Sequence, residues 1–283
     1  MNKTDSADVR PAGRATGGGV SYRTLVSFVG AGPGDPELIT LKGLRRLREA
    51  DVVIHDRLVP GELLHETRPD AEIVDAGKAP GRHCLAQVEI NWLLVDRARR
   101  GGRVVRLKGG DPAVFGRLAE EIDAVRSAGI AFEIVPGVTA ATAAAARAGI
   151  SLTERGRASM LLLATATDHT GRTPSGLDWG LLARAEGTLA FYMSVRSLEE
   201  ITASLTALGR DPREHAILVE GVGTAGERII AGRLGDIATD ARAAGAQSPA
   251  VLITGPTVAS ASAPLGVRRV LAEAAASPLT VDA

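Results

Sequence analysis

From Arg23 onward, short apolar runs alternate with stretches whose apolar residues recur with helical spacing. The runs are rich in leucine and β-branched residues, which is typical of buried strands. Strands that alternate with helices in this way predict an α/β fold with much parallel sheet. In the first half of the chain, strands are expected at residues 24–29, 51–55, 71–74, 103–107 and 132–135.

The stretches between these runs are predicted to be helices. Four leucines repeat every three residues between positions 38 and 47, among basic neighbours. This repeat indicates that one apolar face of a helix carries all four leucines. Helices are therefore expected at residues 38–49, 87–99 and 117–128.

The pattern changes around Pro136 and Gly137. An alanine-rich helix is expected at residues 139–148, with Gly149 as its cap. The strands that follow lie closer together than those before, which predicts a second α/β domain with a mixed sheet. Its strands are expected at 159–165, 188–193, 216–219, 228–231 and 250–254, and its other helices near 197–208 and 235–244.

These patterns divide the chain into four parts. Residues 1–22 are rich in Gly, Ser, Thr, Asp and Arg without a continuous apolar segment, so we expect a disordered tail rather than a secretory signal. Residues 23–138 and 139–262 are expected to form an N-terminal and a C-terminal α/β domain. Residues 263–283 are rich in Ala, Ser and Pro, and we expect a loose C-terminal tail there.

Charge and cysteine content limit the partners that this chain can have. Lys plus Arg equals Asp plus Glu at 33 each, so no overall field attracts nucleic acid or an anionic membrane, and neither partner is expected. A single cysteine, Cys84, excludes an intramolecular disulfide and a cysteine-based zinc cluster, and no metal is expected. No apolar run approaches the roughly 20 residues that span a bilayer. We therefore expect a cytoplasmic protein.

The first apolar run ends in a glycine-rich loop at residues 29–37, with the sequence VGAGPGDPE. A dinucleotide fingerprint needs a third glycine where Asp35 stands, and this carboxylate would repel a pyrophosphate, so NAD is not expected. A phosphate-binding P-loop fails as well, because neither Lys nor Ser/Thr follows Gly34. A plain tight turn stays open as an alternative. Pro33 argues against it, because proline fixes φ and removes a backbone donor.

Two further loops lead from a predicted strand into a predicted helix. Residues 106–117, RLKGGDPAVFGR, place a glycine turn between Lys108 and Asp111, and residues 136–141 read PGVTAA. Loops at the carboxyl ends of parallel strands are where an open α/β sheet binds its ligand. Together the three loops predict a ligand site that is built largely from backbone.

Six segments carry a resemblance to a known family: VGAGPGDPELITLKGL, ADVVIHDRLV, GKAPGRHCLAQVEIN, RVVRLKGGDPAVFGR, VPGVTAATAAAARAGISLTER and AFYM. In order and spacing they resemble the uroporphyrinogen-III C-methyltransferases of the tetrapyrrole methylase family, over residues 25–257. The resemblance implies two α/β domains, S-adenosylmethionine (SAM) in the cleft between them, S-adenosylhomocysteine as product, and a homodimer. It also implies methylation of rings A and B of uroporphyrinogen III, which yields precorrin-2 for sirohaem, cobalamin or haem d1.

Carried over position by position, the resemblance implies which residues contact SAM. A zwitterionic sulfonium needs backbone donors and acceptors at close range, and glycines permit that approach. Met193 is expected to pack on adenine beside Tyr192, and the alternative is an ordinary core methionine. The implied SAM contacts are Pro33, Gly109, Gly110, Asp111, Val114, Thr139, Ala140, Tyr192, Met193 and Val222.

The resemblance also implies residues for the chemistry. Asp56 and Lys78 match positions that the family is thought to use as proton acceptor and donor. The alternatives are a strand-end cap for Asp56 and a solvated surface lysine for Lys78. Arg117 and Arg155 are expected to bind substrate carboxylates, because guanidinium groups bind carboxylates bidentately. Glu120, one helical turn after Arg117, is expected to be its partner or to accept a pyrrole N–H.

Several positions depart from the family's usual sequence. Ala113 replaces a phenylalanine, Leu118 and Ala119 replace two small residues, Glu154 replaces a histidine, and Ala166 replaces a glycine. Glu154 adds a negative charge where an octacarboxylate would approach. These departures keep two alternatives open: SAM-dependent C-methylation of another electron-rich heteroaromatic, such as an indole or a later corrin intermediate, and a non-catalytic SAM-binding or dimerisation module.

Overall fold

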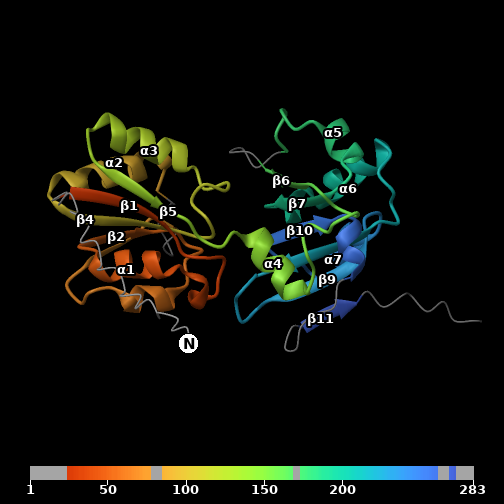
Figure 1. The fold of residues 1–283 in the computed structure, drawn as a ribbon, viewed down its shortest axis with the longest axis horizontal. Coiled ribbons are helices and arrows are strands. Elements are labelled where there is room, and N and C mark those ends of the chain that lie inside the picture. The colour runs from red at the N-terminus through yellow and green to blue at the C-terminus, as the bar shows by residue number, and fades with distance from the viewer. Residues whose placement is uncertain (1–23, 78–84, 168–172, 261–267, 272–283) are drawn as a thin grey trace, which may run out of the picture.

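The computed structural model describes residues 24–77, 85–167, 173–260 and 268–271. Two α/β halves lie side by side and are joined by a short segment that runs into the first helix of the second half (Figure 1). The first half contains a five-stranded sheet and the second half a six-stranded sheet. The predicted α/β class, with a separate sheet in each half, is confirmed.

The first sheet is parallel throughout. Its strands are β1 (Thr24–Gly30), β2 (Val52–His55), β3 (Glu72–Asp75), β4 (Gly102–Lys108) and β5 (Phe132–Val135). Their order across the sheet is β3-β2-β4-β1-β5. Because β1 and β4 are neighbours, with Gly30 opposite Lys108, their carboxyl ends lie side by side. The loops after these two strands are thereby placed at one edge of the sheet.

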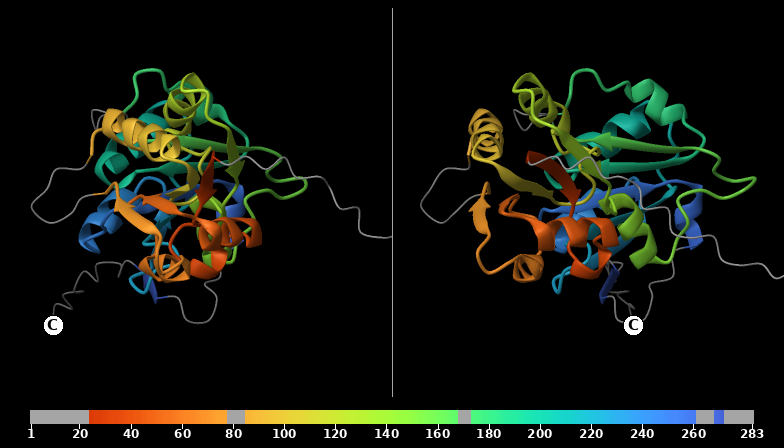
Figure 2. Two further views of the ribbon diagram at one scale, coloured as in Figure 1. Left: turned by 90° about the vertical axis from the view of Figure 1, so that its left-hand side faces the viewer. Right: turned by 60° about the vertical axis from the view of Figure 1, so that its left-hand side comes forward.

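Helices cover both faces of the first sheet (Figure 2). They are α1 (Leu41–Glu49), α2 (Gln87–Arg99) and α3 (Leu118–Ser127), with the 3-10 helices η1 (Pro36–Leu38) and η2 (Gly61–Glu66). On one face, Leu94 of α2 and Val125 of α3 pack with Phe28 of β1. On the other face, Leu47 of α1 packs with Val53 of β2. Both faces of the sheet are therefore core.

The second sheet is mixed, as predicted. Its strands are β6 (Leu161–Thr165), β7 (Thr188–Tyr192), β8 (His215–Glu220), β9 (Arg228–Arg233), β10 (Ala250–Thr254) and β11 (Arg268–Leu271). They are ordered β11-β9-β8-β10-β7-β6. β6 pairs with β7, and β11 with β9, in parallel, whereas the other pairings are antiparallel.

The second sheet is also covered on both faces. Its helices are α4 (Ala140–Ala148), α5 (Trp179–Arg184), α6 (Leu198–Ala207) and α7 (Ile237–Ala243), with the 3-10 helices η3 (Val195–Ser197) and η4 (Pro256–Ser260). Ala144 of α4 packs with Ile217 and Ile253 on one face, and α5, α6 and α7 pack around Phe191 and Leu218 on the other. Among the described helices, none is both long and apolar enough to cross a bilayer.

The leucine repeat of the first helix does not form one buried face, and this prediction is wrong. Thr40 caps the helix, its Oγ1 accepting from the amide of Gly43 at 3.1 Å, so α1 begins only at Leu41. Three residues rotate about 60° short of a full turn, so leucines at this spacing spread around the helix. Leu41 is 82% exposed, whereas Leu47 is fully buried.

Two other elements differ from the sequence-based expectation. The short helix α5 was not predicted, and it begins after Asp178, whose carboxylate accepts from the amide of Leu181 at 2.9 Å. The strand β11 lies within residues 263–283, where a loose tail was expected, and it pairs with β9. That range is therefore not loose throughout. The domain boundaries at 22, 138 and 262 stay predictions.

Glu133 on β5 ties α1 to the edge of the first sheet. Its carboxylate accepts hydrogen bonds from the hydroxyl of Ser27 at 3.0 Å and from the guanidinium of Arg46, and it lies 2.7 Å from Lys42 Nζ. Burial alone would raise the pKa of Glu133, but these three donors outweigh it and lower the pKa to about 2. The ionised carboxylate therefore stabilises the fold.

We expect Glu133→Gln to lower the free energy of unfolding at pH 7 by about 2 kcal/mol. Because the folded pKa is depressed, this stabilisation is complete above about pH 5 and is lost as the pH falls toward about 2. Urea unfolding at several pH values measures the difference, with Glu66→Gln as a control, since Glu66 is 41% exposed in its pair with Arg48. A difference that stays constant from pH 7 to pH 3 would contradict this account.

Candidate active site

The three glycine-rich loops meet at the carboxyl ends of β1, β4 and β5. The amide of Gly110 donates to the carbonyl of Gly32 at 2.7 Å, and the reverse bond spans 3.3 Å. The amide of Gly137 donates to the carboxylate of Asp111 at 3.0 Å. The loops are thus bonded to one another, as their predicted positions at one sheet edge required.

Glycine is required where these loops cross. A Cβ atom at Gly137 would lie 2.3 Å from the carbonyl oxygen of Gly110 and 2.8 Å from the Cα of Gly30. A Cβ atom at Gly30 would lie 2.6 Å from that same oxygen. Three backbones therefore approach within contact distance because none of them carries a side chain there.

The loop after β1 also contacts the second half. A Cβ atom at Gly34 would lie 2.3 Å from the carbonyl oxygen of Val222, and one at Gly223 would lie 2.6 Å from the amide nitrogen of Asp35. The Asp35 carboxylate caps η1, where it accepts from the amide of Glu37 at 2.9 Å. The carboxylate that argues against a dinucleotide is therefore bound to local backbone.

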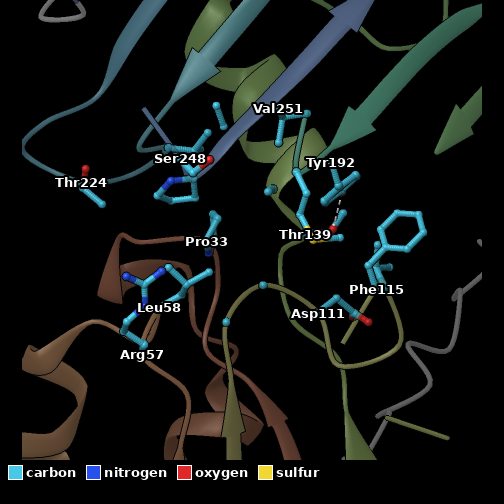
Figure 3. A pocket seen from close by; sticks show the side chains of 18 residues that line it. Pro33, Arg57, Leu58, Asp111, Phe115, Thr139, Tyr192, Thr224, Ser248 and Val251 are labelled. Carbon is cyan, nitrogen blue, oxygen red and sulfur yellow. Dashed lines mark hydrogen bonds between the residues drawn. The ribbon is translucent and has the colours of Figure 1, made fainter. Parts of the chain in front are cut away.

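A cavity of about 410 Å³ lies at these loops and is lined by residues from both halves (Figure 3). Every residue expected to contact SAM lines it: Pro33, Gly109, Gly110, Asp111, Val114, Thr139, Ala140, Tyr192, Met193 and Val222. These positions are widely separated in the sequence, and the fold brings them to one place. Their binding of SAM stays a prediction.

An aromatic pair closes one end of the cavity. The Tyr192 hydroxyl accepts from the amide of Ala141 at 3.0 Å and shares a hydrogen bond of 2.6 Å with the hydroxyl of Thr139, drawn in Figure 3. The rings of Phe115 and Tyr192 lie 4.9 Å apart between centroids. The hydroxyl of Tyr192 is therefore satisfied, and its ring remains available as an apolar wall.

Left-handed backbone marks the same end. Phe115, Arg117 and Met193 are the non-glycine residues of the described chain with positive φ, at 50°, 55° and 54°. Such conformations cost about 1–3 kcal/mol each and gather at functional sites. Met193 is also 46% exposed. The alternative of an ordinary core methionine is therefore wrong for Met193.

A buried cluster of charges lies behind the ends of β2 and β4. Arg106 donates to Asp56 at 2.5 Å and to Glu121 at 3.1 Å. The ammonium of Lys108 donates to both oxygens of Glu121, at 2.9 and 3.0 Å, and lies 4.0 Å from Asp56. Burial, and next the charge of Arg106, lower the pKa of Lys108. Two cations and two carboxylates balance one another, as burial requires.

Asp56 stands at the exposed edge of this cluster. Its side chain is 33% exposed, whereas those of Arg106 and Glu121 are 2% and 0% exposed. The carboxylate pairs with Arg106 instead of capping the end of β2, so the strand-end cap is wrong. The next two residues, Arg57 and Leu58, line the cavity. Its role as proton acceptor stays a prediction.

Asp56, Arg117, Glu120 and Arg155, which are expected to act on the substrate, do not line the cavity. Arg117 and Glu120 pair at 2.8 Å, as expected, and hydrogen bonds from Arg117 lower the pKa of Glu120. Arg155 is exposed on the turn that joins Glu154 and Ala158. Lys78 lies outside the described residues. The structure therefore brings the expected cofactor residues together, and among the described residues it leaves Arg117, Glu120 and Arg155 outside the cavity.

Several cavity residues were missed from the sequence. The signal for Arg57, Leu58 and Phe115 was adjacency, because each lies within a segment that resembles the family. The residues from 248 onward stand in no such segment, and only the pairing of β10 with β7 and β8 places them there. The missed residues are Arg57, Leu58, Phe115, Thr224, Ser248, Pro249, Ala250 and Val251.

A parallel sheet and a mixed sheet that share a cavity of backbone-rich loops define an α/β protein with a cavity at its strand ends, where proteins of this class bind small organic ligands. A family model for tetrapyrrole (corrin/porphyrin) methylases matches residues 25–238. The chain belongs to this family, as the resemblance implied.

Individual relatives agree with this assignment. The chain is 44% identical over 234 residues to the uroporphyrinogen-III C-methyltransferase of Bacillus subtilis (strain 168), covering 83% of this chain and 48% of that protein. It is 46% identical over 236 residues to the siroheme synthase of Edwardsiella ictaluri (strain 93-146), covering 83% and 50%. The chain therefore spans about half the length of the curated relatives it matches.

Two solved structures share the fold over most of the chain. The uroporphyrin-III C-methyl transferase from Thermus thermophilus, complexed with S-adenyl homocysteine, is 41% identical with a TM-score of 0.69, covering 82% of this chain and 92% of that one. A cobalt precorrin-4 methyltransferase is 31% identical with a TM-score of 0.74, covering 83% and 95%. Both are methyltransferases by name.

Proposed function

We propose that this chain is a SAM-dependent C-methyltransferase that converts uroporphyrinogen III to precorrin-2 by methylating rings A and B. The observation that carries the proposal is the one cavity that all the expected SAM contacts line. The Bacillus subtilis relative is named for this reaction, and the Thermus thermophilus relative holds the demethylated product.

The cavity residues fit SAM by their chemistry. Gly109 and Gly110 let a ligand reach the backbone, and the strained, half-exposed Met193 offers a thioether surface to a purine. Gly30 and Gly137 keep the loops close enough to form one wall. When bound, SAM supplies an electrophilic methyl group on its sulfonium.

The residues of the chain would position the reactants and exchange protons with the macrocycle, with a net loss of one proton from the ring for each methyl group added. Methylation of a ring carbon must be followed by loss of a proton from the macrocycle. Asp56 would accept that proton, because its carboxylate is fixed by Arg106 at the end of β2 and is a third exposed. Lys78 would act as proton donor. Holding the reactants in line supplies much of the rate enhancement.

We expect Arg117→Ala and Arg155→Ala each to raise KM for the tetrapyrrole about tenfold, because an octacarboxylate loses a bidentate guanidinium. The dissociation constant of S-adenosylhomocysteine should stay within about twofold, since neither residue lines the cavity. Arg126→Ala is the matched control, because Arg126 forms the same i,i+3 surface pair on α3 with Asp123. Unchanged steady-state kinetics in both variants would show that these arginines do not bind the substrate.

One observation weighs against the alternative substrate. Glu154, which replaces a histidine usual in the family, pairs with Arg157 at 2.9 Å. Its charge is compensated locally, so it does not oppose an approaching carboxylate as the sequence suggested. Ala113, which replaces a phenylalanine usual in the family, is exposed and leaves a smaller side chain at the end of the GGDP loop. The replacement at Ala113 is the one observation that favours the second candidate function, methylation of a different heteroaromatic substrate.

The proposal also covers the pathway, the cellular location and the oligomeric state of the chain. The product would feed sirohaem, cobalamin or haem d1 formation in the cytoplasm, and the chain would act as a homodimer without nucleic acid or membrane partners. Relatives named siroheme synthase and cobalt precorrin-4 methyltransferase support the pathway. The proposed reaction includes no metal and no NAD.

Incubation of the purified chain with SAM and uroporphyrinogen III tests the function directly. We expect mass spectrometry to show a product that has gained two methyl groups, with two equivalents of S-adenosylhomocysteine. One added methyl group would limit the reaction to a single ring. An unchanged tetrapyrrole with bound SAM would favour the second candidate.

A further inference from the structure

We propose that Arg57 is a carboxylate-binding residue of the cavity. The inference rests on the proposed function in one respect, because both proposed reactants, SAM and an octacarboxylic tetrapyrrole, carry carboxylates. Four features of the described residues support it: the turn that holds Arg57, the packing of that turn, the unpaired guanidinium in the cavity, and the facing side chains.

The backbone at Arg57 is fixed on both sides. The amide of Asp56 donates to the carbonyl of Leu107 at 3.1 Å, which continues the pairing of β2 with β4. The amide of Val59 donates to the carbonyl of Asp56 at 3.2 Å and closes a turn with Arg57 and Leu58 at its centre. Because Val59 is buried, these two central side chains are left on the cavity side.

The turn is also wedged between two glycines. The Cβ of Leu58 lies 3.1 Å from the place that a Cβ would take at Gly109, and the Cβ of Arg57 lies 2.6 Å from the corresponding place at Gly77. A side chain at Gly77 would displace Arg57. The position of the arginine is therefore set by packing at its base, and its guanidinium remains free to meet a ligand.

The two charged side chains that line the cavity, Arg57 and Asp111, do not pair with each other. The Asp111 carboxylate is held by backbone instead, since it accepts from the amides of Ala113 at 2.8 Å and Gly137 at 3.0 Å. Within the described residues Arg57 has no ion pair or hydrogen bond, so the cavity presents one unpaired guanidinium.

Figure 3 shows what faces this cation. Arg57 and Leu58 lie on the side of the first half, and Thr224 and Ser248 lie across the cavity on the side of the second half. The hydroxyl of Thr224 donates to the carbonyl of Gly221 at 2.7 Å and accepts from the amide of Gly226 at 3.3 Å, so it is already paired within its own loop. The unpaired guanidinium of Arg57 suits a carboxylate, which Arg binds with two parallel N–H donors.

Two ligands could supply the carboxylate: the methionine part of SAM and a side chain of the tetrapyrrole. The experiment compares Arg57→Gln and Arg57→Lys with wild type by calorimetric binding of three probes. S-adenosylhomocysteine carries the amino-acid carboxylate, 5′-methylthioadenosine lacks it, and uroporphyrin III carries the tetrapyrrole carboxylates. Arg99→Gln is the control, because Arg99 is an exposed arginine on α2 that does not line the cavity.

We expect Arg57→Gln to weaken one carboxylate ligand by about tenfold or more, with Arg57→Lys between it and wild type. A loss for S-adenosylhomocysteine but not for 5′-methylthioadenosine assigns the methionine carboxylate. A loss for uroporphyrin III alone assigns the tetrapyrrole. Binding of all three probes within twofold of wild type would overturn the proposal.

The same measurements separate this inference from the proposed function. All three probes report binding without turnover. A wild type that fails to methylate uroporphyrinogen III would refute the function, while the binding of S-adenosylhomocysteine would still test Arg57. A wild type that binds none of the probes would refute both, and a thermal melt of each variant verifies that it is folded.

Discussion

Gly137→Ala is expected to reduce the proposed methyl transfer by about a hundredfold and to weaken S-adenosylhomocysteine binding to a similar extent. The added Cβ would lie 2.3 Å from the carbonyl oxygen of Gly110, and backbone cannot turn aside as a side chain can. The loops after β4 and β5 must therefore move apart by about 1 Å, which misplaces cavity residues on both. The strain should lower the free energy of unfolding by about 3 kcal/mol.

The matched control for this change is Gly61→Ala. A Cβ at Gly61 would meet nothing within 4 Å, and Gly61 does not have positive φ. The control should retain wild-type activity and thermal stability. Titration calorimetry and urea unfolding provide the two measurements for each variant. Wild-type binding in Gly137→Ala would show that the crossing of the loops is not part of the site.

Glu121→Gln is expected to lower the free energy of unfolding by about 3–5 kcal/mol. Glu121 is fully buried and is the shared acceptor of Arg106 and Lys108. Without its charge, two buried cations would share one carboxylate, Asp56, at the edge of the cluster. The same change should lower kcat, because Arg106 holds Asp56 only while its own position is fixed.

Glu120→Gln is the control for this change, and the double variant Glu121→Gln with Lys108→Met tests whether stability can be rescued. Glu120→Gln, on an exposed pair with Arg117, should cost less than about 1 kcal/mol in urea unfolding. Adding Lys108→Met to Glu121→Gln removes the excess cation and should restore part of the lost stability. If Glu121→Gln is no more costly than Glu120→Gln, the cluster does not carry the stability assigned to it.

The fold was largely predictable because apolar periodicity reports burial directly. The parallel first sheet and the mixed second sheet both followed from the spacing of the strand-like runs. The leucine repeat failed because a spacing of three does not keep four residues on one side of an α-helix. The helix α5, Trp179–Arg184, is too short to establish a period of its own.

The site was predictable in its backbone and less so in its charges. The glycines in these loops indicate that backbone segments approach one another closely, and the resemblance assigned the neighbouring residues to SAM binding. Lys108 and Glu121 were not singled out, because charged residues are almost never fully buried unless paired, and their partners are distant in sequence. Arg57 was not predicted, because its position at the cavity depends on a turn and its lack of an ion partner among the described residues depends on the fold.

The connection between the two halves is itself part of the cavity wall. The amide of Gly137 in this connection donates to the carboxylate of Asp111, and the hydroxyl of Thr139 is hydrogen-bonded to that of Tyr192 at one end of the cavity. Any rotation of one half against the other must therefore reshape the binding space. By thermodynamic linkage, a ligand that prefers one shape of the cavity also selects one orientation of the halves. Ligand occupancy of the cavity and the relative orientation of the two halves therefore change together.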